Sequence, residues 1–201
     1  ICAGAVPGCQ TYRRGGSPSH ATLALGPLDC LCLGSHFVRT GLLFDEPDIE
    51  DGQSLDAYGV QWLWDRGVAS PFLHPLENAE LSDVPRHPRP PLHEPVQLIR
   101  QDIVQRSLVI ADAPCPGLLE LCFMLRNAWR FLDDVTSDWK MASALMEWSL
   151  ETIVESYAHM LGQLPSQPDI IVYSDDLGFH DSMFLSPTDF RTHLLPRLRT
   201  L

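Results

Sequence analysis

Two adjacent carboxylates, Asp175 and Asp176, directly follow an apolar run near the C-terminal end of the chain. The run, residues 170–173, is rich in β-branched side chains and predicts a buried strand. Charge is costly in a dry core without partners, so we expect the pair at the strand's exit, where α/β folds bind ligands. Such a pair can accept hydrogen bonds from a polar substrate or share a proton. An acidic turn in solvent, with Gly178 supplying a positive φ, remains the alternative.

A second group of candidates follows the other clear apolar run, residues 107–111. Asp112, Pro114 and Cys115 form the loop after this predicted strand and should line the same mouth as the acidic pair. A simple strand-to-helix turn explains the same residues equally well. Nothing nearby in the sequence would activate Cys115 as a nucleophile, which favours a packed or idle thiol.

The elements that must position these groups alternate between strand and helix. Apolar residues recur at helical spacing after the first strand and again over residues 138–161. The first stripe comprises Leu118, Cys122, Leu125, Trp129 and Leu132, and the second comprises Ala142, Met146, Ile153, Tyr157 and Met160. This order predicts that the two strands are parallel neighbours or near-neighbours with their carboxyl ends at one face.

A helix start follows the acidic pair. Ser186 is the predicted N-cap, Pro187 occupies the first helical position and Asp189 the capping-box position, while Leu185 and Phe190 form a hydrophobic staple. The sequence therefore predicts a strand, an acidic loop and a capped helix in succession.

The N-terminal half gives weaker signals. Residues 1–40 show no clear period, residues 58–64 predict a strand with an aromatic stripe, and residues 96–104 predict a helix. Core packing is favoured for the stripe over a tetrapyrrole or cofactor platform. Five prolines between Pro85 and Pro95 indicate an extended connector.

The composition limits the classes of function. The 201 residues are 45% hydrophobic and 20% charged, as in ordinary globular domains. A net charge of −12 argues against binding nucleic-acid phosphates or an anionic membrane surface. The six cysteines are expected to be reduced, and no signal peptide or membrane span is recognisable, which favours a cytoplasmic location. The first residue is Ile1 rather than Met, which leaves a fragment or a processed product open.

Three segments taken in order resemble the uroporphyrinogen decarboxylase superfamily, especially its corrinoid-dependent methyltransferase-like branch. They are DAYGVQW at residues 56–62 with HPL at 74–76, APCPGLLEL at residues 113–121, and DDLGFHDSMFLSPTDFRTHLLPRL at residues 175–198. The resemblance covers residues 54–201. It implies a (β/α)8 TIM barrel, and since such barrels need about 250 residues, an incomplete one over residues 41–201.

The resemblance also implies a function and its partners. The expected activity is methyl transfer, with a corrinoid protein or cobalamin, or a small-molecule methyl donor, as partner. Asp175 and Asp176 are the candidate catalytic residues, and Asp112, Pro114, Cys115, Gly178 and His180 are the candidate substrate-binding residues. A porphyrinogen decarboxylase of tetrapyrrole biosynthesis is one alternative, and an inactive fragment or a binding module is another. Homo-oligomerisation is left open.

Zinc binding is implied by the family resemblance alone. In the resembling methyltransferases a His-x-Cys pair and a distant cysteine hold zinc, and these ligands lie downstream of the Asp-Asp-Leu-Gly loop. No His-x-Cys occurs in this chain, so no metal ligand is assigned, with His180 and His74 as the weak exceptions. The chain as given is therefore expected to bind no stoichiometric zinc and to show no independent methyltransferase turnover.

Overall fold

The computed structural model describes residues 37–40, 52–65, 68–92, 108–112 and 116–201. The elements follow one another as β1 (Phe37–Thr40), β2 (Gln53–Leu55), β3 (Gln61–Asp65), β4 (Val68–Leu73), the 3-10 turn η1 (Val84–Arg86), β5 (Leu108–Asp112), α3 (Leu118–Arg126), α4 (Ala128–Ser137), α5 (Trp139–Gln163), β6 (Ile170–Val172), α6 (Pro187–Asp189), the π-helical segment η2 (Phe190–Leu194) and α7 (Leu195–Leu198). Most of residues 1–40, the predicted helix at 96–104, and Pro114 with Cys115 lie outside the described residues.

A three-stranded parallel sheet has the order β1-β5-β6. Ile110 is paired with Ile170 and Asp112 with Val172, so the carboxyl ends of β5 and β6 lie at the same edge. Asp169 fixes this register, because its backbone N–H donates to the carbonyl oxygen of Val109 (2.9 Å) and its carboxylate accepts from the N–H of Val109 (2.8 Å). The predicted parallel neighbours are confirmed.

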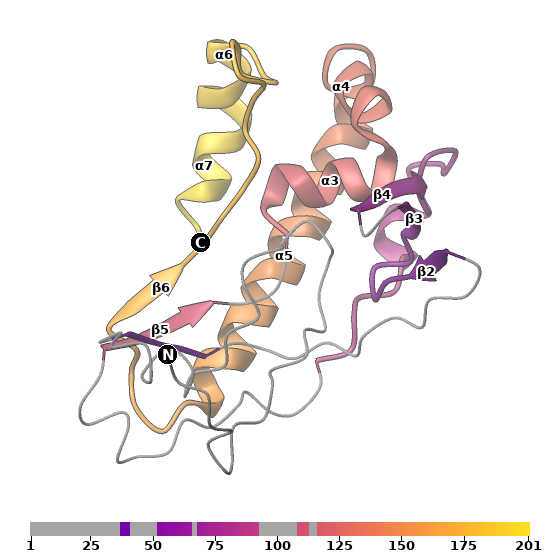
Figure 1. Ribbon diagram of the computed structural model, residues 1–201. Coiled ribbons are helices and arrows are strands. Elements are labelled where there is room, and N and C mark those ends of the chain that lie inside the picture. Colours follow the sequence, from indigo (N-terminus) through magenta and orange to yellow (C-terminus); the bar gives the residue numbers. More distant parts are fainter. Residues whose placement is uncertain (1–36, 41–51, 66–67, 93–107, 113–115) are drawn as a thin grey trace.

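The predicted burial of β6 is wrong. Ile170 is 40% exposed and Ile171 is 53% exposed. The apolar run does form a strand, but among the described residues β6 pairs with β5 alone and lies at the edge of the sheet (Figure 1). An edge strand buries less of its side chains than a central one.

The second sheet is antiparallel, with the order β2-β3-β4. Its central strand starts at Gln61, later than the sequence predicts, because Gly59 forms a turn at a φ of 81°. The carboxylate of Asp56 stabilises that turn, accepting from the backbone N–H groups of Tyr58 and Val60 (both 2.9 Å) and from Nε1 of Trp62 (2.8 Å). Tyr58 and Trp62 are buried in the core, as the aromatic stripe predicts.

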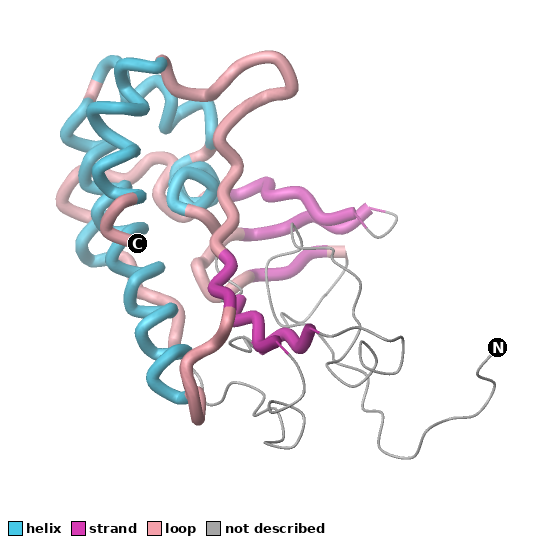
Figure 2. Tube along the Cα trace, turned by 90° about the vertical axis from the view of Figure 1, so that its left-hand side faces the viewer, coloured by secondary structure: helices cyan, strands magenta, loops and turns pink. Residues whose placement is uncertain are grey.

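The helices α3, α4 and α5 pack together and contribute most of the core, and they lie on one side of the strands (Figure 2). The stripe of α5 is confirmed, with Ala142, Met146, Ile153 and Met160 fully buried. The stripe that runs from α3 into α4 breaks at Asn127, which has a φ of 71° and whose side chain accepts from the N–H of Trp129 (3.0 Å). The break leaves Trp129 72% exposed, contrary to the prediction.

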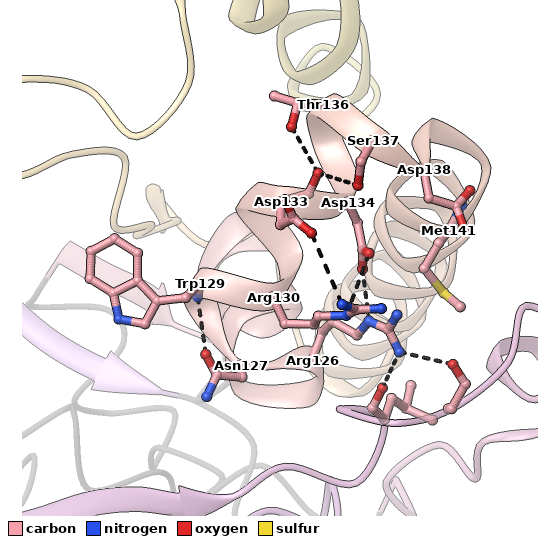
Figure 3. A network of polar contacts seen from close by, with 12 residues as sticks. Arg126, Asn127, Trp129, Arg130, Asp133, Asp134, Thr136, Ser137, Asp138 and Met141 are labelled. Atoms are coloured by element: carbon pink, nitrogen blue, oxygen red, sulfur yellow. Dashed lines mark hydrogen bonds and ion pairs between the residues drawn. The ribbon is translucent and has the colours of Figure 1, made fainter.

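A buried ion pair joins α3 to α4, and its arginine also binds the segment after the antiparallel sheet (Figure 3). Nε of Arg126 donates to Asp134 (2.8 Å), and Nη1 donates to the carbonyl oxygens of Leu76 (2.6 Å) and Ala79 (2.9 Å). Both buried charges of this pair thus have a partner, as burial requires. The Arg126 guanidinium therefore connects α3, α4 and the segment at residues 76–79.

The C-terminal helix begins as the sequence predicts. The Ser186 side chain accepts from the N–H of Asp189 (3.1 Å), and Pro187 is the first helical residue. Arg197 of α7 then anchors the helix to α5 by donating to Ser143 (3.0 Å) and Glu147 (2.6 Å). None of the helices in the described part of the chain is long and apolar enough to cross a membrane.

Candidate functional site

The carboxylate of Asp175 lies at the N-terminus of α3. Its Oδ2 accepts from the backbone N–H of Leu119 (3.1 Å) and its Oδ1 accepts from that of Glu120 (3.0 Å). The first N–H groups of a helix have no partners within it and favour a negative group. Asp175 therefore caps α3 from another segment of the chain, 55 residues or more away in sequence.

Tyr173 completes this arrangement. Its hydroxyl donates to Oδ2 of Asp175 (2.8 Å) and accepts from the backbone N–H of Leu118 (2.8 Å). The first three N–H groups of α3 are thus satisfied by two residues from the exit of β6. The Tyr173 hydroxyl and the Asp175 carboxylate together hold the exit of β6 at the N-terminus of α3.

Gly117 makes the contact between the strand exit and the helix sterically possible. A Cβ on Gly117 would lie 2.3 Å from Cγ and 2.4 Å from Cα of Asp175. No side chain fits in that space. Gly117 is not among the site residues that the sequence predicts, although it lies between a predicted strand and a predicted helix.

The local electrostatics separate Asp175 from an ordinary surface carboxylate. Burial raises the pKa of Asp175, although the N–H groups of Glu120 and Leu119 and the hydroxyl of Tyr173 act in the opposite direction. Nearby, burial raises the pKa of the Cys122 thiol to about 12, and the Asp175 carboxylate adds to this shift. Cys122 is a free, buried thiol and stays protonated at neutral pH.

Asp176 differs from its neighbour because its side chain is exposed to solvent. Its backbone N–H donates to Oδ1 of Asp175 (3.0 Å). Asp175, which is bound to α3, therefore also fixes the backbone of Asp176. The acidic pair is divided between a carboxylate that is engaged within the fold and a carboxylate that faces solvent.

The loop after the pair folds back on itself. Gly178 and Met183 form an antiparallel bridge, and a Cβ on Gly178 would lie 2.6 Å from the carbonyl oxygen of Ser182. Among the described residues the glycines with positive φ are Gly52 and Gly59, so Gly178 does not supply the positive φ of the alternative, an acidic turn in solvent. A glycine is needed at position 178 because the backbone of Ser182 lies too close to leave room for a side chain. His180 lies at the exposed turn of this loop.

Aromatic rings hold the same loop against α3 and α4. Phe179 stacks on Trp129 of α4 (6.4 Å between centroids) and meets Phe184 edge-on (4.6 Å). Phe184 meets Phe123 of α3 (4.9 Å), which in turn contacts the buried Phe131 (5.8 Å). The acidic loop is therefore anchored at the β6 exit by Asp175 and farther along by a row of aromatic contacts.

Of the remaining predicted site residues, Pro114 and Cys115 lie outside the described residues and Asp112 lies within them. Asp112 ends β5 and is paired with Val172 at the end of β6, so its backbone lies at the edge that carries the acidic pair. His74 serves the fold, because its Nδ1 lies 2.7 Å from the carbonyl oxygen of Met124, an acceptor, and therefore carries the proton.

The structure gives no fit for a metal ion in its described part. Within residues 52–65, 68–92, 108–112 and 116–201, no three His, Cys, Asp or Glu side chains come close enough to hold one. The zinc implied by the family resemblance therefore has no ligand set among these residues.

Comparison with solved structures shows a related fold in a methyltransferase from Methanosarcina mazei. The TM-score is 0.54 at 17% sequence identity, and the match covers 88% of this chain and 51% of that protein. The chain thus spans about half the length of this relative. No protein-family model matches the sequence, and the search of curated proteins gives no match. At this identity the likeness shows a shared fold.

Proposed function

We propose that this chain is part of a methyltransferase of the uroporphyrinogen decarboxylase superfamily, in which a corrinoid carries the methyl group. The observation that carries the proposal is the fold shared with the Methanosarcina mazei methyltransferase over 88% of the chain. The DDLG and DAYGVQW segments support the corrinoid-dependent branch, and an incomplete (β/α)8 barrel is the architecture that goes with it.

We assign ligand binding to Asp176. Its carboxylate is exposed at the carboxyl end of a parallel strand, where α/β proteins bind substrates. The rim of a corrinoid carries amide side chains, whose N–H groups are donors for a carboxylate acceptor. Asp175 is a positioning residue in this proposal, since its oxygens are already engaged by α3 and Tyr173.

The first test is binding of methylcobalamin to the purified chain, followed by visible absorption and calorimetry. Binding is the appropriate readout, because the chain spans about half of the related methyltransferase and turnover is not expected from it alone. We expect Asp176→Asn to weaken binding about tenfold, the loss of one charge-assisted hydrogen bond of ~1.4 kcal/mol.

Asp181→Asn is the matched control, because Asp181 is exposed in the same loop and its carboxylate accepts a hydrogen bond from the neighbouring hydroxyl of Ser182 (3.4 Å). Its binding should equal that of the unaltered chain. The proposal is overturned if methylcobalamin does not bind, or if the two variants bind equally well.

A further inference from the structure

An unusual backbone turn at the start of α4 holds the ring of Trp129 in solvent. Among the described residues, Asn127 is the non-glycine residue with a positive φ (71°), and its ψ of 134° lies outside the left-handed helical region that asparagine tolerates. The indole of Trp129 is 72% exposed and points away from the buried pair of Arg126 and Asp134 (Figure 3). Backbone strain of this kind gathers at functional sites.

The loop between β6 and α6 brings further apolar side chains to the same place. The ring of Phe179 is 50% exposed and lies 6.4 Å from the Trp129 indole, measured between centroids. Met183, whose backbone is bridged to that of Gly178, is 45% exposed. Trp129, Phe179 and Met183 form what we call the aromatic patch. All three lie in the continuously described stretch 116–201, so their neighbours along the chain are described as well.

The rings of the aromatic patch are held in place from below. Phe184 meets Phe179 edge-on (4.6 Å between centroids), and it meets Phe123 of α3 in the same way (4.9 Å). The exposed rings therefore need little ordering when they bind, which lowers the entropic cost of an interaction. Exposed apolar side chains that lie together with polar residues around them mark interaction sites.

The surroundings of the aromatic patch are acidic. Residues 175–190 contain four aspartates and no lysine or arginine, and Asp176 and Asp181 are exposed. Arg130, next to Trp129, is already paired with Asp134 (3.7 Å). Two copies of this loop would repel each other, which disfavours a second copy of the chain as the occupant, whereas a basic surface would be attracted.

We propose that the aromatic patch binds a partner protein that presents lysine or arginine side chains around an apolar group. Aromatic residues and methionine are enriched in the cores of protein interfaces, and tryptophan is a frequent hot spot there. Small ligands instead bind in concave sites that enclose most of their surface, whereas the side chains of the patch are 45–72% exposed. Neither a corrinoid nor methyl transfer is needed for this interaction.

A pair of synthetic peptides serves as the probe. Both form amphipathic helices with leucine on one face and contain no tryptophan, and the opposite face carries lysine in one peptide and glutamate in the other. Fluorescence anisotropy of a label on each peptide measures binding. We expect the lysine peptide to bind saturably and to shift the tryptophan emission of the chain to shorter wavelength, as Trp129 leaves water. The glutamate peptide should bind at least about tenfold more weakly.

Two variants test the apolar and the charged part of the patch separately. Trp129→Ser should raise the Kd of the lysine peptide at least about tenfold and abolish the emission shift. Asp181→Lys should raise the Kd about threefold or more at low salt and less at high salt, because salt screens exposed charges. Val154→Ser is the control, since Val154 is 39% exposed on α5, and its Kd should equal that of the unaltered chain. Circular dichroism verifies that each variant is folded.

The proposal is overturned if the lysine peptide does not bind, or if the glutamate peptide binds as tightly. An unchanged affinity in Trp129→Ser or in Asp181→Lys contradicts it as well, and so does a loss of binding in Val154→Ser equal to that in Trp129→Ser. Sedimentation velocity of the chain without peptide covers the other occupant. A dimer that Trp129→Ser dissociates would assign the aromatic patch to a second copy and not to a basic partner.

Discussion

Asp175 occupies the space that a side chain on Gly117 would fill. A Cβ at position 117 would lie 2.3 Å from the carboxyl carbon of Asp175, and the carboxylate hydrogen-bonds the two N–H groups of Leu119 and Glu120. A glycine and an acid from separate segments thus form a single junction between β6 and α3. The position of Asp176, and of the loop that follows it, depends on this junction.

Gly117→Ala should destabilise the fold by about 1–3 kcal/mol, the usual cost of inserting a methyl group where the backbone cannot move away. Chemical unfolding measures the change in free energy. Gly162→Ala is the control, because nothing lies within 4 Å of a Cβ at this helical position. It should stabilise the chain by about 0.5–1 kcal/mol. Equal effects of the two variants would contradict the steric argument.

Asp175 and Asp176 should respond differently to loss of charge. Asp175→Asn keeps the size of the side chain but removes one acceptor oxygen, so one of the donors on Leu119, Glu120 and Tyr173 loses its partner. We expect the free energy of unfolding to fall by about 1–3 kcal/mol. Asp176→Asn, at an exposed position, should change stability by less than about 0.5 kcal/mol. Thermal and chemical unfolding of both variants decide the matter, and a larger effect at Asp176 would show that the roles are reversed.

The elements that the sequence predicts correctly depend on local patterns. The apolar runs give β5 and β6 and their parallel pairing, the helical spacing gives α5, and Ser186 gives the start of the last helix. Each of these follows from residues that are close together in the chain, so a single sequence is enough to find them.

The features that the sequence does not predict depend on contacts between distant segments. The sequence predicts Asp175 as a site residue but not its bonds to α3, which join residues 55 and 56 positions apart. Similarly, Glu151 and Glu155 are exposed, as their spacing on one helix face indicates, but their ion pairs with Arg89 join residues 62 and 66 positions apart. The sequence does not predict the break at Asn127, because an isolated asparagine within an apolar period rarely adopts a positive φ.

His87 should make the stability of the fold depend on pH. Its Nε2 lies 2.9 Å from the carbonyl oxygen of Tyr58 and therefore carries a proton in the neutral ring. Burial lowers the pKa of His87 below 6.5, although the bond to Tyr58 and the carboxylate of Asp56 act in the opposite direction. As the pH falls below 6.5 the unfolded chain binds a proton that the folded chain does not, so the free energy of unfolding decreases.

Unfolding measured between about pH 8 and about pH 5 checks this dependence. His87→Gln keeps a donor for the carbonyl oxygen of Tyr58 but cannot titrate. It should be less stable than the unaltered chain above pH 6.5, because the ring contact with Trp148 is lost, and the difference should shrink at lower pH. A difference that stays constant over this range would exclude His87 as the titrating group.

The buried pair of Arg126 and Asp134 should be the most sensitive polar contact in the helical layer. The two side chains are 4% and 2% exposed, and Arg126 also donates to two carbonyl oxygens after the antiparallel sheet. Asp134→Asn leaves a buried guanidinium without its counter-charge and should cost about 3–5 kcal/mol in the free energy of unfolding. Asp133→Asn provides the control, since the Asp133 carboxylate is exposed and lies 4.0 Å from Arg130. That variant should lose less than about 1 kcal/mol in the free energy of unfolding.

Arg126→Met combined with Asp134→Leu should recover part of the stability that Asp134→Asn loses, because no charge then remains buried. If the double variant is no more stable than Asp134→Asn, the bonds from Arg126 to the carbonyl oxygens of Leu76 and Ala79, and not the ion pair, hold these segments together.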